Sequence, residues 1–262
     1  MKANTHPVES DKSDFSTLGL YLYKGSGRKK IRELRRYYES ICEKDIDRSK
    51  PYIYFAANYQ PEATTVPNAG YYVNLHLIVN ILSRAIPSDW LIYYKEHPTT
   101  FWETAEGFRN RDQQYYATLK EFENVRLISS EMNAFDLMDG CRAVATATGV
   151  SAWEALLRGK PAMIFGSVWF SGCNSIFKIH SFDDAVAAVE SIRDGYRPDP
   201  ADVERFIAAV EHTAHKELIV RNYPDRMAAA GNREIELRKL ANAFSRGYDA
   251  YMQLTDASKT LI

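Results

Sequence analysis

The sequence predicts an α/β fold in which a Rossmann-like parallel β-sheet is flanked by helices, with helical extensions at both ends of the chain. Two observations carry this prediction. Short apolar runs alternate with helix-length segments between residues 51 and 180, as in βαβ units. Polar residues suited to ligand binding follow these runs, and sheets of this kind bind ligands at the carboxyl ends of their strands.

The core elements follow from run length and apolar periodicity. Short, continuous apolar runs are expected to be strands at 52–57, 90–94, 125–128, 143–147 and 162–165. Segments with apolar residues at helical spacing are expected to be helices at 72–85, 111–121, 134–138 and 151–157. Together they form a predicted Rossmann-like core of residues 51–180.

Two extensions flank this core. Residues 1–50 are predicted to hold a short strand over 18–23 and a strongly basic helix over 28–44. Residues 181–262 are predicted to be a helical region that packs on the core, with breaks near Pro198 and Tyr223.

Composition limits the class of protein. The formal net charge is −1, so no overall field attracts nucleic acid. The three cysteines lack metal-ligand spacing and are expected to be small core residues. The polar N-terminus has no signal-peptide core, and no apolar run reaches the ~18 residues of a membrane span. We therefore expect a soluble, cytoplasmic protein.

Residues 146–166 are the most informative segment. They are predicted to form a strand end, a glycine turn, a short helix and a second strand. Gly149 and Ser151 then lie at a helix N-terminus, where free N–H groups and the helix dipole favour a phosphate. Glu154 lies one turn further on, within reach of ligand hydroxyl groups. With the Lys95-Glu-His-Pro98 segment after an earlier strand, this pattern indicates a nucleotide-sugar site.

The polar residues after the predicted strands are expected to share one edge of the sheet. Five loops contribute Glu62, Lys95, His97, Ser129, Ser130, Thr148, Ser151 and Asn174. Lys95 and His97 would favour a departing phosphate, with His97 as hydrogen-bond donor or general acid. Glu62 follows Gln60-Pro61, a rigid turn that can hold a catalytic carboxylate.

Each candidate also has a purely structural interpretation. His97 could cap a strand, and Glu62 could be a solvated loop residue. Glu154 could pair with Arg158 at i+4, and Asp136 could be an exposed helix residue. Trp153, Trp169 and Phe170 are more consistent with packing than with ligand stacking. His212 and His215 are more consistent with a solvated helix face.

Several familiar chemistries lack a motif. The sequence contains no GxGxxG after a strand and no GxxxxGK[ST]. It has no HExxH or CxxC, so no metal site is predicted, and no GxSxG nucleophile elbow.

Taken together, several segments resemble bacterial capsular and surface polysaccharide biosynthesis proteins. They are 59–65, 90–98, 145–149, 153–162 and 177–179. Within that group the sequence is most similar to the nucleotide-binding half of β-Kdo transferases, which have a GT-B architecture. The resemblance covers about residues 51–180. The Lys-x-His-Pro element also resembles one in bacterial sialyltransferases and polysialyltransferases, which favours a CMP-sugar donor over a UDP-sugar donor.

The resemblance implies roles for particular residues. His97 would contact the CMP phosphate and help it depart, and Lys95 would add positive charge. Glu62 would be an active-site carboxylate, and Asp136 is the candidate for a second one. Further residues would bind the donor, the first three at the phosphate or cytidine and the last at the ribose: Thr148, Gly149, Ser151 and Glu154. Enzymes of this kind need no metal ion, because protein groups stabilise the leaving phosphate.

The implied function is a glycosyltransferase that moves Kdo or a related acidic sugar from CMP to a capsule or lipopolysaccharide glycan. Alternatives are a UDP-sugar-dependent GT-B transferase or epimerase, and a non-catalytic nucleotide-binding or assembly module. Only about 50 residues precede the first core strand, too few for the second Rossmann-like domain of a GT-B enzyme. A missing N-terminal domain or a partner chain would complete it; the alternative is that the chain is a reduced relative of such enzymes. The basic helix would bind an anionic acceptor, the inner face of the cytoplasmic membrane, or that domain.

Overall fold

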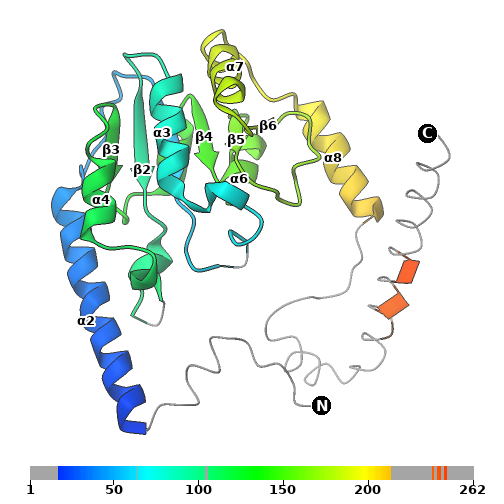
Figure 1. Ribbon diagram of the computed structural model, residues 1–262. Helices are drawn as coiled ribbons and strands as arrows, with labels where there is room; N and C mark the ends of the chain where they lie inside the picture. The colour runs from blue at the N-terminus through cyan, green and yellow to red at the C-terminus, as the bar shows by residue number, and fades with distance from the viewer. Residues whose placement is uncertain are drawn as a thin grey trace. The chain divides into compact units, whose positions relative to one another are not determined.

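The computed structural model describes residues 17–213, without 63, 104 and 105, together with residues 238, 241, 242, 245 and 246. The chain divides into two compact units, 1–206 and 207–262. The sheet and its surrounding helices belong to the first unit, and their arrangement can be followed in Figure 1.

The first unit alternates strands and helices, as expected. The strands are β1 (Tyr52–Ala56), β2 (Leu91–Lys95), β3 (Val125–Ile128), β4 (Ala143–Thr146), β5 (Ala162–Ile164) and β6 (Phe177–Lys178). The α-helices are α2 (Thr17–Ile41), α3 (Leu75–Ala85), α4 (Gln113–Leu119), α5 (Ala134–Gly140), α6 (Ser151–Leu157) and α7 (Phe182–Arg193). A further helix, α8 (Pro200–Thr213), begins in the first unit and ends in the second. Short 3-10 helices are η1 (Gly70–Val73), η2 (Pro98–Phe101) and η3 (Gly107–Arg109).

All six strands are parallel and lie in the order β3-β2-β1-β4-β5-β6. The chain first builds the sheet outward from β1 through β2 to β3. It then returns to the other side of β1 and continues through β4 to β6. This reversal is the topological switch point of a Rossmann-like sheet, where a crevice opens beyond the carboxyl ends of the strands. The predicted fold class is confirmed.

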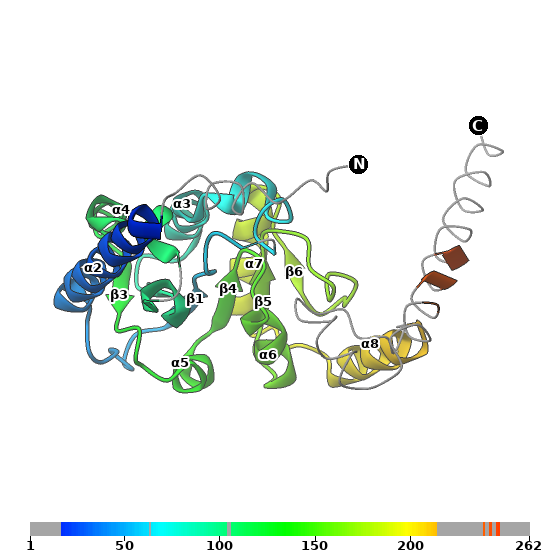
Figure 2. The same cartoon turned by 90° about the horizontal axis from the view of Figure 1, so that it is seen from below.

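Helices cover both faces of the sheet, and this explains the continuous apolar runs of the strands. Figure 2 shows α3 and α7 on one face and α5 and α6 on the other. Side chains alternate between the two cores along β1: Ile53 and Phe55 pack with α3, whereas Tyr52 and Tyr54 pack with α5 and α6.

Local sequence fixes where most helices begin. The side chains of Asn74, Asp112, Asn133 and Ser181 accept hydrogen bonds from backbone N–H groups in the first turns of α3, α4, α5 and α7. By contrast, α6 begins after Val150, whose side chain provides no cap. That difference matters because α6 faces the crevice.

Two sequence predictions at the edges of the core were wrong or incomplete. Residues 18–23, expected as a strand, lie within α2, which continues the basic helix toward the N-terminus. The run alternates leucine with tyrosine and glycine and contains no β-branched residue, so little favoured a strand. The two-residue strand β6 was not predicted. None of the described helices is long and apolar enough to cross a membrane.

Candidate functional site

A pocket of about 370 Å³ opens at the switch point. Its walls come from the loops that follow β1, β2 and β4 and from the beginnings of α5 and α6. Seven of the predicted site residues line it: Glu62, Lys95, His97, Thr148, Gly149, Ser151 and Glu154. The fold therefore gathers residues from distant parts of the sequence around one cavity. Glu62 and Glu154, for example, are 92 positions apart.

Lys95 is the last residue of β2 and is only 5% exposed. Its ammonium forms no ion pair or hydrogen bond with any residue in the part of the chain that the structure describes. Burial lowers its pKa, while the charges of Glu96 and Glu39 act in the opposite direction. Because Lys95 lines the pocket and its ammonium is not enclosed by protein, an anion bound there would supply a direct counter-charge.

His97 lies at the mouth of the same pocket and begins η2. Its Nδ1 accepts a hydrogen bond from the Thr99 N–H at 3.2 Å. His97 therefore caps the start of a 3-10 helix rather than a strand, and this role does not compete with ligand binding. When Nδ1 accepts this bond, the neutral ring carries its proton on Nε2, which remains available as a donor. Partial desolvation lowers the pKa of His97, and the carboxylates of Glu96 and Glu62 raise it.

The two predicted carboxylates occupy different parts of the pocket. Glu62 is exposed in the loop after β1, next to a cis Gln60–Pro61 peptide bond. Glu154 is half-buried in the first turn of α6. Its alternative role as a partner of Arg158 is excluded, because Arg158 binds Asp139 through two hydrogen bonds instead.

The loop after β4 is held by Asn58, from the loop after β1. The Asn58 side-chain oxygen accepts from the Thr146 hydroxyl at 3.0 Å, and its amide donates to the Thr148 hydroxyl at 3.2 Å. Thr146 Oγ1 in turn accepts from the Gly149 N–H. A Cβ on Gly149 would lie 2.7 Å from that Thr146 oxygen, so this close approach requires glycine.

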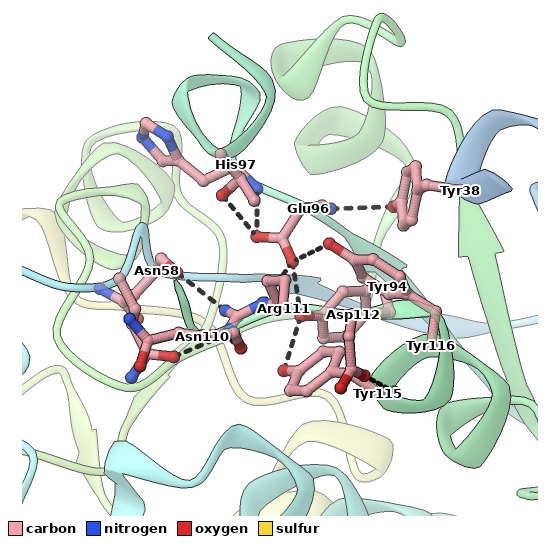
Figure 3. Close-up of polar contacts among 12 residues, drawn as sticks. Tyr38, Asn58, Tyr94, Glu96, His97, Asn110, Arg111, Asp112, Tyr115 and Tyr116 are labelled. Atoms are coloured by element: carbon pink, nitrogen blue, oxygen red, sulfur yellow. Dashed lines mark hydrogen bonds and ion pairs between the residues drawn. The ribbon is translucent and has the colours of Figure 1, made fainter. Parts of the chain in front are cut away.

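Behind Lys95 and His97 lies a buried ion pair between Glu96 and Arg111, shown in Figure 3. Arg111 Nε donates to Glu96 Oε2 at 2.7 Å. The hydroxyl groups of Tyr116, Tyr94 and Thr100 also donate to the Glu96 carboxylate. Burial raises the pKa of both tyrosines, so they remain protonated donors.

Other predicted members of the polar edge lie elsewhere. Ser129 and Ser130 both bind the carboxylate of Glu39 on α2. Asn174 donates to Asp202 at 3.4 Å. Ser129, Ser130 and Asn174 do follow strands, as expected. Their strands, β3 and β5, are not the two that flank the switch point, β1 and β4, so the loops after β3 and β5 contact other parts of the protein. The expectation that all five loops share one site was too broad.

Asp136 is also outside the pocket. It is exposed in the first turn of α5, whereas Ala134 and Met138 are the residues of that helix that line the cavity. The structure therefore does not bring Asp136 together with Glu62 and His97, because the helical repeat turns position 136 away from positions 134 and 138.

The remaining structural interpretations can be checked in the same way. Trp153, Trp169, Phe170 and Phe206 form one aromatic cluster with ring centroids 5.1 to 6.1 Å apart. His212 is exposed, as expected for a solvated helix face, and His215 lies outside the described residues.

The structure also shows how deeply the cysteines are buried and whether metal-ligand side chains lie together. Cys141 and Cys173 are buried and Cys42 is half-buried, which confirms their packing role. Burial raises the pKa of Cys141 to about 12, so its thiol stays protonated at neutral pH. Among the described residues, no group of three His, Cys, Asp or Glu side chains could hold a metal ion.

A parallel sheet covered by helices on both faces, with a pocket at its switch point, defines the Rossmann-like class of α/β proteins. The sequence comparison identifies the family. A model of the capsule polysaccharide biosynthesis protein family matches residues 15–174, more than half of the chain, and the chain belongs to this family. Its fold is a Rossmann-like parallel sheet flanked by helices, and its family is one of capsule polysaccharide biosynthesis.

Solved structures with a similar arrangement are distant. KpsC from Thermosulfurimonas dismutans, a β-Kdo 2,7-transferase, is 16% identical with a TM-score of 0.39 over 76% of this chain. The UDP-GlcNAc 2-epimerase from Methanocaldococcus jannaschii is 16% identical with a TM-score of 0.44 over 71% of this chain. The chain spans 62% of the first protein and 51% of the second. No curated protein matches the sequence at a significant level.

Three residues that hold the pocket loops in place were not selected from the sequence: Asn58, Glu96 and Arg111. Glu96 stands between two residues that were selected, but a charged residue beside a strand end gives no sign that it is fully buried. Arg111 was assigned to the start of a helix. The sequence does show an arginine 15 positions after Glu96, in a segment rich in tyrosines. Only the fold, however, shows that Arg111 and Glu96 form an ion pair.

Proposed function

We propose that this protein is a glycosyltransferase that moves Kdo or a related acidic sugar from a CMP-activated donor to a capsule or lipopolysaccharide glycan. The observation that carries this proposal is Lys95, a largely buried lysine that lines a pocket at the switch point of the sheet and whose ammonium forms no ion pair within the described residues. An anionic phosphate placed there would compensate that charge. His97 lies beside it with Nε2 free to donate.

The chemistry follows from this arrangement. The bond between the anomeric carbon and the donor phosphate breaks, and CMP leaves with the bonding electrons. Lys95 and His97 stabilise the negative charge that develops on the departing phosphate. Glu62, on the opposite loop, is assigned the role of active-site carboxylate, as a base for the acceptor hydroxyl or as a nucleophile. We assign no such role to Asp136, given its position.

The other pocket residues are assigned to donor binding. The Thr148 hydroxyl accepts from Asn58 and still has its own proton to donate to a phosphate or cytidine oxygen. Ser151 and the backbone around Gly149 lie beside it, at the uncapped start of α6. Glu154 can accept hydrogen bonds from ribose hydroxyl groups. The proposal assigns no metal ion, because these groups, Lys95 and His97 supply the contacts the phosphate needs.

The loops at the carboxyl edge of the sheet favour a further protein surface as a partner. Loops that follow β1, β2, β4 and β5 each carry large apolar side chains with exposed fractions of 56% to 89%: Val66, Tyr71, Trp102, Val150 and Trp169. Exposed apolar residues gathered at one edge are typical of an interaction site. We assign this edge to an N-terminal domain or partner chain that closes the pocket and contributes the acceptor site.

The basic helix α2 gives weaker support for binding to a membrane surface or an anionic acceptor. Part of its charge is compensated within the protein, because Lys29, Arg32 and Arg35 pair with glutamates. Association with the inner face of the cytoplasmic membrane is therefore a secondary proposal.

Calorimetric titration of the purified chain with CMP, using UDP as the control, tests the donor assignment. We expect CMP to bind, and we expect binding to be lost in Glu154→Ala. Binding of UDP alone would redirect the assignment to a UDP-sugar transferase or epimerase. Slow hydrolysis of CMP-Kdo without an acceptor would separate an enzyme from a non-catalytic binding module, which should leave the donor intact.

A further inference from the structure

Arg111 lies behind the wall of the pocket rather than in it, and it connects two of the pocket loops. Its guanidinium donates to Gln60 Oε1 at 2.7 Å and to the Asn58 carbonyl at 3.2 Å, both in the loop after β1. It also donates to Glu96 Oε2 at 2.7 Å, in the loop after β2. Figure 3 shows Asn58 and Glu96 both bonded to the Arg111 side chain.

The connection continues to the third loop through Asn58. While its carbonyl accepts from Arg111, its side chain binds the hydroxyl groups of Thr146 and Thr148 in the loop after β4. A single chain of buried hydrogen bonds thus joins all three loops that form the pocket.

On the β2 side, Glu96 holds the backbone from which Lys95 and His97 project. Its Oε1 accepts from the His97 N–H at 2.8 Å, and its own N–H donates to the Tyr38 hydroxyl of α2 at 3.0 Å. Glu96 and Arg111 are almost completely buried. A buried pair of this kind keeps one geometry only while both charges and their hydrogen bonds are present.

We infer that Arg111 is a positioning residue: by holding Glu96, Gln60 and Asn58 together, it fixes Lys95 and His97 relative to Thr148 and Glu62. A lysine could keep the positive charge but not a planar fork that reaches several acceptors at once. The inference rests on the proposed function only for the ligand, a phosphate-bearing nucleotide.

Arg111→Lys tests the inference because it preserves the charge balance with Glu96. We expect a folded variant whose affinity for CMP is weaker by about tenfold, the effect of losing roughly one charge-assisted hydrogen bond in the bound geometry. In the protein without ligand, the amide resonances of Thr148 and Gly149 should shift, although neither residue touches Arg111.

Tyr52→Phe is the matched control. It removes a buried hydrogen bond to the Leu137 carbonyl, at the opposite end of β1 from the pocket. This variant should lose stability but keep the wild-type Thr148 and Gly149 resonances and CMP affinity. The comparison separates positioning from a general loss of stability.

Unchanged resonances and unchanged affinity in folded Arg111→Lys would overturn the inference. If Arg111→Lys does not fold, Gln60→Met gives the same test, because it removes one acceptor and leaves the Arg111–Glu96 pair intact. Gln60→Met should then shift the same resonances by a smaller amount, and no shift would overturn the inference. If the wild-type chain binds neither CMP nor UDP, the proposed function fails, but the resonance shifts still test the positioning role.

Discussion

At the residue scale, Lys95 combines two opposite effects. Burial lowers its pKa more than the charges of Glu96 and Glu39 raise it, so the folded protein holds the proton less tightly than the unfolded chain does. The charged side chain therefore reduces the free energy of unfolding at neutral pH. The same property favours an anionic ligand, since binding supplies the missing counter-charge. A residue that costs stability and lines a cavity is a typical functional residue.

Lys95→Met should separate these effects. We expect the melting temperature to stay the same or rise, because the methionine side chain needs no counter-charge. We expect CMP affinity to fall by about tenfold or more, because a charge-assisted contact to the phosphate is lost. Thermal unfolding and calorimetric titration of the same preparation measure both. Unchanged affinity would remove Lys95 from the phosphate site.

His97 and Glu62 are expected to act in the reaction itself. His97→Ala and Glu62→Gln should abolish sugar transfer while circular dichroism spectra and melting temperatures remain close to wild type, because both side chains are exposed at the pocket mouth. Asp136→Asn is a suitable control from outside the pocket. Transfer at the wild-type rate in either active-site variant would exclude that residue from the mechanism.

At the scale of elements, α3 and α4 are joined by His76. Its Nε2 lies 2.9 Å from the Tyr115 carbonyl, and its ring packs against the Tyr115 ring at 4.2 Å. Burial lowers the pKa of His76, and the hydrogen bond to Tyr115 only partly offsets this. The neutral form, with its proton on Nε2, is therefore the one that connects the two helices.

The sign of the pH dependence follows from this lowered pKa. Below about pH 6.5 the unfolded chain binds a proton at this residue more readily than the folded protein does. The contribution of His76 to stability is therefore complete above that pH and decreases as the pH falls through it. His76→Gln should lose less stability than wild type between pH 7.5 and pH 5.5, as measured by urea unfolding. Equal losses would contradict this assignment.

At the scale of the whole molecule, distant segments approach each other closely beside the pocket. The Ser167 N–H donates to the Asn68 carbonyl at 2.8 Å, which ties the loop after β5 to the loop after β1. A Cβ on Gly166 would lie 2.7 Å from that carbonyl oxygen and 2.8 Å from the Ala69 Cα. Both contacts are with backbone, so neither can relax by rotating a side chain.

Gly166→Ala should therefore destabilise the protein by about 1–3 kcal/mol, the usual cost of forcing an extra methyl group into a packed site. Gly172→Ala is the control, because its added Cβ would meet only a Phe206 ring carbon at 3.3 Å. Chemical unfolding of both variants provides the comparison. Equal stabilities of the two variants would show that the two loops are not held as closely as described.

Most of the fold was predictable because a parallel sheet covered on both faces leaves continuous apolar runs in the sequence. The boundaries of β1 to β5 were therefore close to those observed. The two-residue strand β6 is too short to leave such a run. The helix over residues 18–23 was mistaken for a strand because a run of leucine and tyrosine over six residues fits either element.

The candidate site was predictable to the extent that it lies at strand ends. Lys95, His97 and Thr148 could be selected because each follows an apolar run. Ser129 could be selected by the same rule, yet it binds Glu39 of α2. The rule finds polar residues at the correct edge of a sheet, but it does not say which strands are neighbours.

The sequence by itself determined the family, the alternation of strands and helices, and the loops that carry polar side chains, because these depend on local composition and spacing. Only the tertiary structure decided that β1 and β4 are adjacent, and hence that the loops after β1, β2 and β4 form one pocket. It also decided that Glu96 and Arg111 are buried together while Lys95 remains unpaired. The physical reason is that strand order and burial are set by long-range packing, and a charged residue carries no local mark of the partner it will meet.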